Sequence, residues 1–178
     1  MRLSKLVATW AVLCLALFAG QAFAFTAKDT RALRIYNTNT KEFVSAVFFH
    51  DGRYNDKEIA RISLLFRDFR QNKAVWIDRR LLNALWVINQ MTTKGEGIIK
   101  LNSGYRTRET NRLLQKKGLR AADNSMHIQG KAIDFSITRV STARLLQAAK
   151  ALNVGGVGEY HSGGFIHLDT GKVRHWSY

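Results

Sequence analysis

Two short segments of the chain carry histidines and aspartates within sequences that otherwise have the composition of β-strands. The first spans residues 125–135 and the second spans residues 165–171. Because strand side chains alternate between two faces, His167 and Asp169 share one face of the second strand with Phe165, while Ile166 and Leu168 point to the other. If the two strands pair, Asp134 on the first strand joins His167 and Asp169 in one patch.

His127 precedes the first strand by a few residues, and Gly130 separates it from that strand. Glycine allows the backbone to turn there, so His127 can swing over the patch. The patch would then hold two neutral imidazoles together with a carboxylate. Two imidazoles and one carboxylate that leave a fourth position open are typical ligands of a catalytic zinc site. The residue types therefore predict one Zn²⁺ per chain.

The N-terminus has the three parts of a secretory signal peptide, which predicts that residues 1–24 are removed on export. Arg2 and Lys5 form a basic start, residues 6–18 are an apolar run, and Ala22-Phe-Ala24 supplies the small residues that precede a cleavage point. The apolar run is too short to favour a membrane-spanning helix, although an uncleaved anchor is the alternative. We therefore expect a periplasmic protein.

Residues 25–178 are long enough for one domain with its own core. The single cysteine, Cys14, lies in the signal segment, so the exported domain needs no disulfide. The formal net charge of the chain is +15, which usually indicates a nucleic-acid partner. Export argues against nucleic acid and favours anionic polymers of the cell envelope; the alternative is that the charge serves only solubility. Nothing in the sequence requires more than a monomer.

The rest of the sequence contains the patterns of both strands and amphipathic helices. Alternating polar and apolar residues predict strands over 31–37 and 42–49, joined as a hairpin. Apolar residues three and four apart predict helices, and the further expected elements are helices over 56–69, 78–91, 107–117 and 143–152 and strands over 98–101, 132–135 and 165–169. This set predicts a single α+β domain with a central antiparallel sheet flanked by helices.

The sequence around the two segments resembles a family of zinc peptidases. The family's motif is Ser-x-His-x-x-Gly-x-Ala-x-Asp followed by a distal His, and its positions are filled here by Ser125, His127, Gly130, Ala132, Asp134 and His167. Ser103-Gly-Tyr-Arg106 upstream and Gly155-Gly-Val-Gly-x-Tyr160 downstream also match. The family includes D-Ala-D-Ala carboxypeptidases and vancomycin-resistance dipeptidases, and its fold is Hedgehog-like. The chain is most similar to the YcbK-like murein endopeptidases, also called murein endopeptidase K, from residues 66–70 to residues 174–176.

This resemblance implies that His127, Asp134 and His167 bind one zinc ion. A zinc ion with three protein ligands lowers the pKa of a water in the open position toward about 7, and it polarises the scissile carbonyl. The resemblance further implies a Hedgehog/DD-peptidase-like fold. It also implies that the substrate is the peptide stem of peptidoglycan, cut at an amide bond.

The resemblance does not identify the general base. Part of the family uses a Glu-x-x-His pattern, but Gly164 stands at the glutamate position here. Asp169 is the first candidate, either for the base or for a residue that orients a metal ligand, and Glu159 and His161 on the preceding turn are alternatives. Arg106 resembles the family's arginine that steadies the substrate or the developing oxyanion.

Three functions fit these expectations. The favoured one is an exported zinc-dependent endopeptidase that cuts murein cross-links, either between D-Ala and diaminopimelate or between two diaminopimelate residues. Within the enzyme class, the alternative is a carboxypeptidase that trims D-Ala-D-Ala. Outside it, the alternative is a non-catalytic, zinc-containing module that binds the cell wall. A measurement of turnover distinguishes the two classes.

Overall fold

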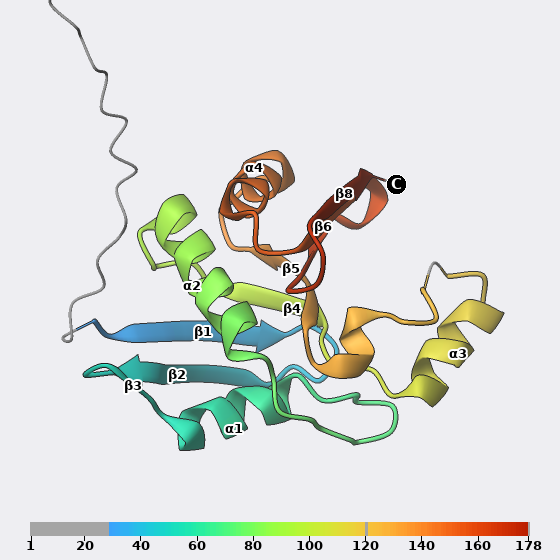
Figure 1. The fold of residues 1–178 in the computed structure, drawn as a ribbon, viewed down its shortest axis with the longest axis horizontal. Coiled ribbons are helices and arrows are strands. Elements are labelled where there is room, and N and C mark those ends of the chain that lie inside the picture. Colours follow the sequence, from blue (N-terminus) through green and yellow to red (C-terminus); the bar gives the residue numbers. More distant parts are fainter. Residues whose placement is uncertain (1–28, 120, 178) are drawn as a thin grey trace, which may run out of the picture.

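The computed structural model describes residues 29–119 and 121–177. These residues form a mixed sheet with helices packed against it (Figure 1). The predicted signal segment, residues 1–24, lies outside the described residues, so the signal peptide stays a prediction. In the described part of the chain, no helix combines the length and the apolar character that a bilayer span requires.

Within these residues the sheet has eight strands in the order β3-β2-β1-β4-β5-β7-β6-β8. Their bounds are β1 Arg31–Asn37, β2 Phe43–His50, β3 Arg53–Tyr54, β4 Ile99–Ser103, β5 Ala132–Ile137, β6 Gly156–Tyr160, β7 Phe165–Asp169 and β8 Arg174–Ser177. The predicted hairpin of β1 with β2 is confirmed. Strands β3, β6 and β8 are additional to those predicted from the sequence.

The expectation of an antiparallel sheet is wrong at two strand pairs, because β1 is parallel to β4 and β6 is parallel to β8. The chain between β1 and β4 passes through two helices, and a crossover of this length returns the next strand in the same direction. Strand β8 follows β7 but lies beyond β6, which is itself antiparallel to β7. The sheet is therefore mixed.

The helices are α1 Asp56–Leu65, α2 Arg79–Thr93, α3 Arg108–Lys116 and α4 Thr142–Leu152, with the short 3₁₀ helices η1 Met126–Gln129 and η2 His161–Gly163. Side chains of Asp78, Thr107 and Ser141 cap α2, α3 and α4, because each accepts a hydrogen bond from a backbone N–H of the first turn. Asp, Thr and Ser are among the residue types that most often cap helices in this way.

Helix α1 begins after Asn55, whose side chain caps it, and ends at Leu65, short of the predicted residue 69. The helix ends there because a residue that follows it forms hydrogen bonds with a distant segment of the chain. Asp68 accepts hydrogen bonds from the backbone N–H and from the hydroxyl of Thr107, each at 2.9 Å. Since Thr107 caps α3, this contact ties the end of α1 to the start of α3.

Gly104 packs directly on the end of α1. The carbonyl of Phe66 accepts a hydrogen bond from the backbone N–H of Tyr105 at 2.8 Å. A Cβ at Gly104 would lie 2.5 Å from the same carbonyl oxygen, so no larger residue fits against this backbone. The contact fixes the carbonyl of Gly104 and the chain that leads to Arg106.

The hydrophobic core lies between the sheet and helices α1, α2 and α4. Ile133 of β5 and Leu168 of β7 are fully buried in it. Because strand side chains alternate, their neighbours Asp134 and His167 point away from this core to the opposite face of the sheet, which we call the site face.

Candidate metal centre

The two segments that carry the histidines and aspartates are adjacent antiparallel strands. In the ladder between β5 and β7, Asp134 pairs with His167 and Ala132 pairs with Asp169. Paired residues of a ladder point to the same face, so both aspartates and His167 lie together on the site face. The predicted pairing and the predicted faces are confirmed.

His127 reaches these side chains from η1, which precedes β5. Ser125 caps η1 by accepting a hydrogen bond from the backbone N–H of His127 at 3.4 Å. Gly130 ends η1 with a φ of +66°, in the left-handed region that favours glycine, and the chain then turns into β5. His127 is 1% exposed, and its predicted position over the patch is confirmed.

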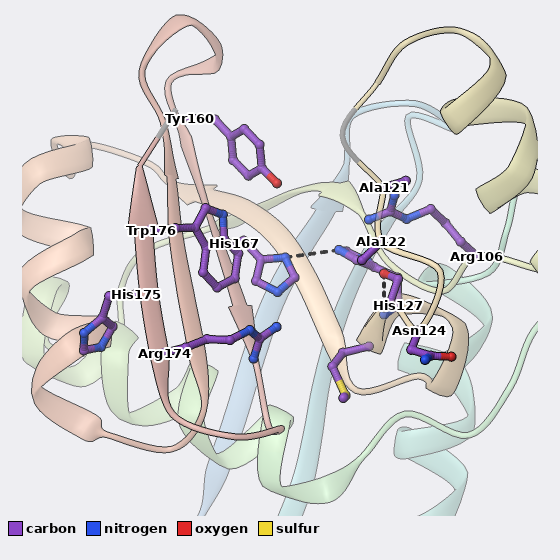
Figure 2. Close-up of a pocket in the computed structure, with 12 residues that line it drawn as sticks. Arg106, Ala121, Ala122, Asn124, His127, Tyr160, His167, Arg174, His175 and Trp176 are labelled. Carbon is purple, nitrogen blue, oxygen red and sulfur yellow. Dashed lines mark hydrogen bonds between the residues drawn. The ribbon is translucent and has the colours of Figure 1, made fainter.

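Three electron-pair donors meet on the site face, and Figure 2 shows the rings of His127 and His167 pointing toward each other. His127 Nε2 lies 3.2 Å from His167 Nδ1 and 3.3 Å from Asp134 Oδ1. His167 Nδ1 lies 3.0 Å from Asp134 Oδ1. Electron-pair donors this close repel one another unless a proton or a metal ion is shared between them. The three atoms therefore form a candidate cation site.

The size of this triangle and the chemistry of its atoms fit zinc. A tetrahedral zinc ion holds its nitrogen and oxygen ligands at about 2.0–2.1 Å, which places the ligand atoms about 3.3 Å apart. The edges of the triangle are 3.0, 3.2 and 3.3 Å. Imidazole nitrogen and carboxylate oxygen are both donors that zinc accepts, and three protein ligands leave a fourth position open.

Each histidine presents one nitrogen to the candidate site because the other nitrogen is bonded elsewhere. His127 Nδ1 donates to the carbonyl of Gly104 at 2.7 Å, which leaves Nε2 facing the site. His167 Nε2 donates to Asp169 Oδ2 at 2.8 Å, which leaves Nδ1 facing the site. Carbonyl and carboxylate groups hold metal-binding histidines in this way in many proteins.

The surroundings of Asp134 and His127 favour the protonation states that metal binding requires. Burial alone would raise the pKa of Asp134, but the charges and hydrogen bonds of His127 and His167 hold the pKa of this carboxyl well below its usual range. Burial lowers the pKa of His127. Burial also disfavours the charged form of His167, yet hydrogen bonds to Asp134 and Asp169 raise its pKa. Asp134 is therefore ionised and His127 is neutral at neutral pH, as a metal requires of its ligands.

Arg106 lies beside the acidic member of the triangle. Its Nη2 is 3.6 Å from Asp134 Oδ2, and its side chain is 12% exposed. Its Nε is buried and has no hydrogen-bond partner among the described residues. Burial lowers the pKa of Arg106 and Asp134 opposes this shift, but an arginine stays charged at neutral pH. A cation with an unused donor group is thus held next to the candidate site.

A cleft of about 560 Å³ opens over the three donors. Figure 2 shows Tyr160 and Trp176 on the same wall as His167, and Ala121, Ala122 and Asn124 across from them. The residues that line the cleft are Arg106, Ala121, Ala122, Asn124, Ser125, Met126, His127, Tyr160, His167, Arg174, His175 and Trp176. Polar and aromatic side chains together suit a peptide rather than a purely apolar ligand.

Asp169 lies next to His167 and is fully buried. Besides His167 it binds the backbone N–H groups of Gly156 at 3.0 Å and Gly171 at 2.8 Å. Burial opposes its ionisation, but hydrogen bonds from His167 and Arg174 hold the pKa of Asp169 well below its usual range. Asp169 is therefore an ionised group enclosed by donors, and it contacts the imidazole nitrogen that points away from the donor triangle.

The two remaining candidates for the general base lie at different places. Gly158 pairs with His167, so strand alternation puts the neighbouring Glu159 on the face of β6 opposite to the site face. His161 begins η2 directly after β6, and its side chain is outside the described part of the chain. The structure thus brings Arg106 and Asp169 to the three donors, but not Glu159.

Tyr160, Arg174 and Trp176 line the cleft, and the sequence alone assigns them no role. The signal that could have identified the last two is their spacing, since residues two apart on a strand point to one face. The spacing can be interpreted only once β6 and β8 are known to pair. Their pairing is not evident from the sequence, because strand β7 lies between them along the chain.

Comparison with known proteins identifies the family of this chain. The sequence model of the family described as peptidoglycan L,D-endopeptidase MepK matches residues 25–176. The peptidoglycan L,D-endopeptidase MepK of Escherichia coli strain K12 and that of Shigella flexneri are each 36% identical over 146 residues, or 82% of this chain and 80% of theirs. A Haemophilus influenzae relative is 35% identical over 146 residues, or 82% of this chain and 78% of its own. No solved structure matches the chain. The chain therefore belongs to the MepK family of peptidases that act on murein.

Proposed function

We propose that this peptidase is a zinc-dependent peptidoglycan endopeptidase, exported to the periplasm, that hydrolyses an amide bond in the peptide cross-links of murein. The observation that carries the proposal is the triangle of His127 Nε2, Asp134 Oδ1 and His167 Nδ1, whose edges of 3.0–3.3 Å suit zinc. The triangle lies under an open cleft, and the named relatives are peptidoglycan endopeptidases.

His127, Asp134 and His167 would hold the zinc ion. When bound, zinc supplies Lewis-acid activation of a water molecule and of the scissile carbonyl. The protein's part is to hold both imidazoles in the orientation that turns one nitrogen of each toward the metal position. The carbonyl of Gly104 does this for His127 at 2.7 Å, and the carboxylate of Asp169 does it for His167 at 2.8 Å.

Arg106 would stabilise the negative charge that develops on the carbonyl oxygen of the substrate. It is a largely buried cation at the edge of the cleft, and the packing of Gly104 on Phe66 helps to set its position. A donor held in place before the reaction needs no rearrangement in the transition state, which makes it effective.

For the general base we retain His161. Asp169 is enclosed by hydrogen-bond donors, so we assign it the orientation of His167 instead of proton transfer. Glu159 lies on the wrong face of β6. His161 directly follows Tyr160, which lines the cleft, and an imidazole has a pKa suited to proton transfer near neutral pH.

The relatives' name favours one of the two cross-links. L,D denotes a bond between a carbonyl from an L centre and an amine on a D centre, which describes the link between two diaminopimelate residues. In the link between D-Ala and diaminopimelate, both centres are D. We therefore propose the link between two diaminopimelate residues as the substrate bond.

A digest of purified murein sacculi tests the proposal. The protein is incubated with sacculi, with added zinc or with a chelator, and the muropeptides are identified by chromatography and mass spectrometry. We expect dimers linked through two diaminopimelate residues to become monomers with zinc and to persist with the chelator. Loss of terminal alanine from intact dimers would instead show a carboxypeptidase, and adsorption without cleavage would show a binding module.

The matched pair of variants for this digest is His127→Ala and His50→Ala. His50 lies on β2, three strands away from β5 in the sheet order, and is exposed. We expect cleavage to be lost in the first variant and retained in the second. Equal cleavage by both variants would exclude the proposed zinc site.

A further inference from the structure

The last strand, β8, forms part of the cleft wall next to His167. It pairs in parallel with β6, so Arg174 stands opposite Gly156 and Trp176 stands opposite Gly158. Gly158 in turn pairs with His167 on β7. The side chains of Arg174 and Trp176 therefore project from the site face, and Figure 2 shows both beside His167.

Both side chains lie over the backbone of β6, in space that only glycine leaves free. A Cβ at Gly158 would lie 2.3 Å from Trp176 Cε2, and a Cβ at Gly156 would lie 2.4 Å from Arg174 Nη1. Any larger residue at either position would have to displace the β8 side chain above it. The two glycines are thus required for Arg174 and Trp176 to reach the middle of the site face.

Arg174 binds Asp169 with both terminal nitrogens. Its Nη2 is 2.7 Å from Oδ2 and its Nη1 is 3.2 Å from Oδ1, the paired geometry that gives arginine–carboxylate contacts their directional strength. Oδ2 of Asp169 also accepts the hydrogen bond from His167 Nε2. Because the Asp169 side chain is 0% exposed, its charge and its orientation depend on these partners and not on water.

Trp176 packs against both His167 and Arg174. The centre of its ring lies 5.2 Å from the centre of the His167 ring, and Arg174 Cζ lies 4.9 Å from the Trp176 ring. The imidazole of His167 is therefore held by a hydrogen bond from Nε2 to Asp169, which Arg174 of β8 also binds, and by the ring of Trp176 at its side.

We infer that Arg174 and Trp176 are positioning residues of the metal centre. Arg174 orients Asp169, and Asp169 together with Trp176 orients the His167 imidazole so that Nδ1 faces the metal position. This inference rests on the proposed function, because it takes His167 as a zinc ligand. It adds the C-terminal strand to the metal centre, although no atom of that strand is a ligand.

The competing explanation is that β8 only stabilises the fold. Loss of an edge-strand ion pair would then lower the free energy of unfolding and leave the zinc affinity of the folded protein unchanged. A positioning role predicts a change in zinc affinity, since groups that orient a metal-binding histidine typically alter it by about 10–100-fold. Zinc affinity of the folded protein is thus the readout that separates the two explanations.

The first experiment compares Arg174→Gln and Arg174→Lys with Lys172→Gln. Lys172 is exposed and lies between β7 and β8, two residues before Arg174, so its variant removes one positive charge without touching Asp169. The zinc dissociation constant of each folded protein is measured by competition with a chromophoric chelator. We expect the zinc dissociation constant to rise about tenfold or more in Arg174→Gln. It should rise less in Arg174→Lys, which keeps the positive charge but loses the paired contact with both oxygens of Asp169. It should stay unchanged in Lys172→Gln.

The second experiment is a double-mutant cycle between Gly158→Ala and Trp176→Gly. We expect Gly158→Ala to weaken zinc binding when Trp176 is present, because the new methyl group displaces the indole. In the Trp176→Gly background the same change should have little further effect, since nothing remains to be displaced. Such non-additivity is the signature of two residues in contact.

The outcomes separate this inference from the proposed function. If the unsubstituted protein binds zinc and Arg174→Gln binds it equally well, the positioning role is excluded while the zinc site stands. Additive effects in the cycle would exclude the role of Gly158. If the unsubstituted protein binds no zinc at all, the zinc site and the positioning role are both excluded.

Discussion

At the scale of single residues, the donor triangle depends on side chains that are held by a second contact. His127 and His167 each use one nitrogen for a structural hydrogen bond and keep the other for the site. Asp134 is ionised because both histidines surround it. Removal of a zinc donor should therefore abolish zinc binding, whereas removal of a group that only transfers a proton should slow cleavage and leave zinc bound.

We expect Asp134→Ala to remove one of the three proposed zinc donors and to leave the fold largely intact. We expect no detectable cleavage of sacculi and loss of zinc binding, because two imidazoles alone make a weak zinc site. Equilibrium dialysis with zinc measures the binding, and circular dichroism of the metal-free protein checks the fold. Zinc bound at one equivalent by this variant would show that Asp134 is not a ligand.

His161→Ala tests the assignment of the general base. We expect kcat to fall by about 10²–10⁴-fold, the usual contribution of a positioned acid or base, while one equivalent of zinc stays bound. The pH profile of any residual activity should lose its acidic limb, since that limb reports the base. Normal turnover by His161→Ala would eliminate His161 as the base.

At the scale of elements, the centre is assembled by contacts between segments far apart in sequence. The end of α1 supports residues 103–107 through Phe66 and Asp68. That support places the carbonyl of Gly104 against His127 at 2.7 Å. A residue such as Asp68, which is buried outside the cleft, therefore contributes to the site through the element that it anchors.

Asp68→Asn should destabilise the protein by about 1–3 kcal/mol, because hydrogen bonds to a buried carboxylate are weakened. Burial opposes ionisation, but hydrogen bonds from Thr107 and from the backbone N–H of Arg70 hold the pKa of Asp68 below its usual value. A lowered folded-state pKa gives stability that is present above the unfolded value of about 3.9 and is lost as the pH falls through the folded value.

The measurement for Asp68 is urea unfolding at several pH values. We expect the difference in unfolding free energy between the unsubstituted protein and Asp68→Asn to be constant from pH 7 to about pH 5 and to shrink below about pH 4. Asp51→Asn, at an exposed turn, is the matched control. A difference that does not change with pH would mean that the charge of Asp68 is not what stabilises the fold.

At the scale of the whole molecule, the excess of positive charge should affect how strongly the enzyme adsorbs to its polymeric substrate. The chain has 28 lysines and arginines against 13 aspartates and glutamates. Murein peptide stems carry carboxylates, so long-range attraction would concentrate the protein on sacculi. Salt weakens such attraction, because the Debye length falls from about 10 Å at 0.1 M to about 3 Å at 1 M.

Adsorption of the protein to sacculi should therefore decrease steeply between 0.1 and 1 M NaCl, as measured by co-sedimentation. Cleavage of a short soluble cross-linked peptide should depend less on salt, because it relies on contacts within the cleft. Chitin, a neutral glycan, is the control polymer and should show little salt-dependent adsorption. Equal adsorption to sacculi at both salt concentrations would rule out a role for the net charge.

Much of the fold follows from local patterns. Helices α2, α3 and α4 lie where the spacing of apolar residues predicts them, and β1, β2, β5 and β7 lie in the segments predicted as strands. Two features could not be predicted locally. Helix α1 ends early because Asp68 bonds to Thr107, a residue far along the chain, and the parallel pairing of β8 depends on which edge remains open after β6 and β7 have paired.

The sequence by itself indicated which side chains share the site face, and its resemblance to the zinc-peptidase motif selected three of them as the expected donors. The types of His127, Asp134 and His167 and their spacing are local properties, because alternation along a strand needs no knowledge of the rest of the fold. Only the tertiary structure decided the tasks of the residues around them. Asp169 and Glu159 are both acidic residues at a strand, yet one is enclosed beside His167 and the other lies on the opposite face. That difference arises from strand register and from the position of β8, which are set by packing of the whole sheet.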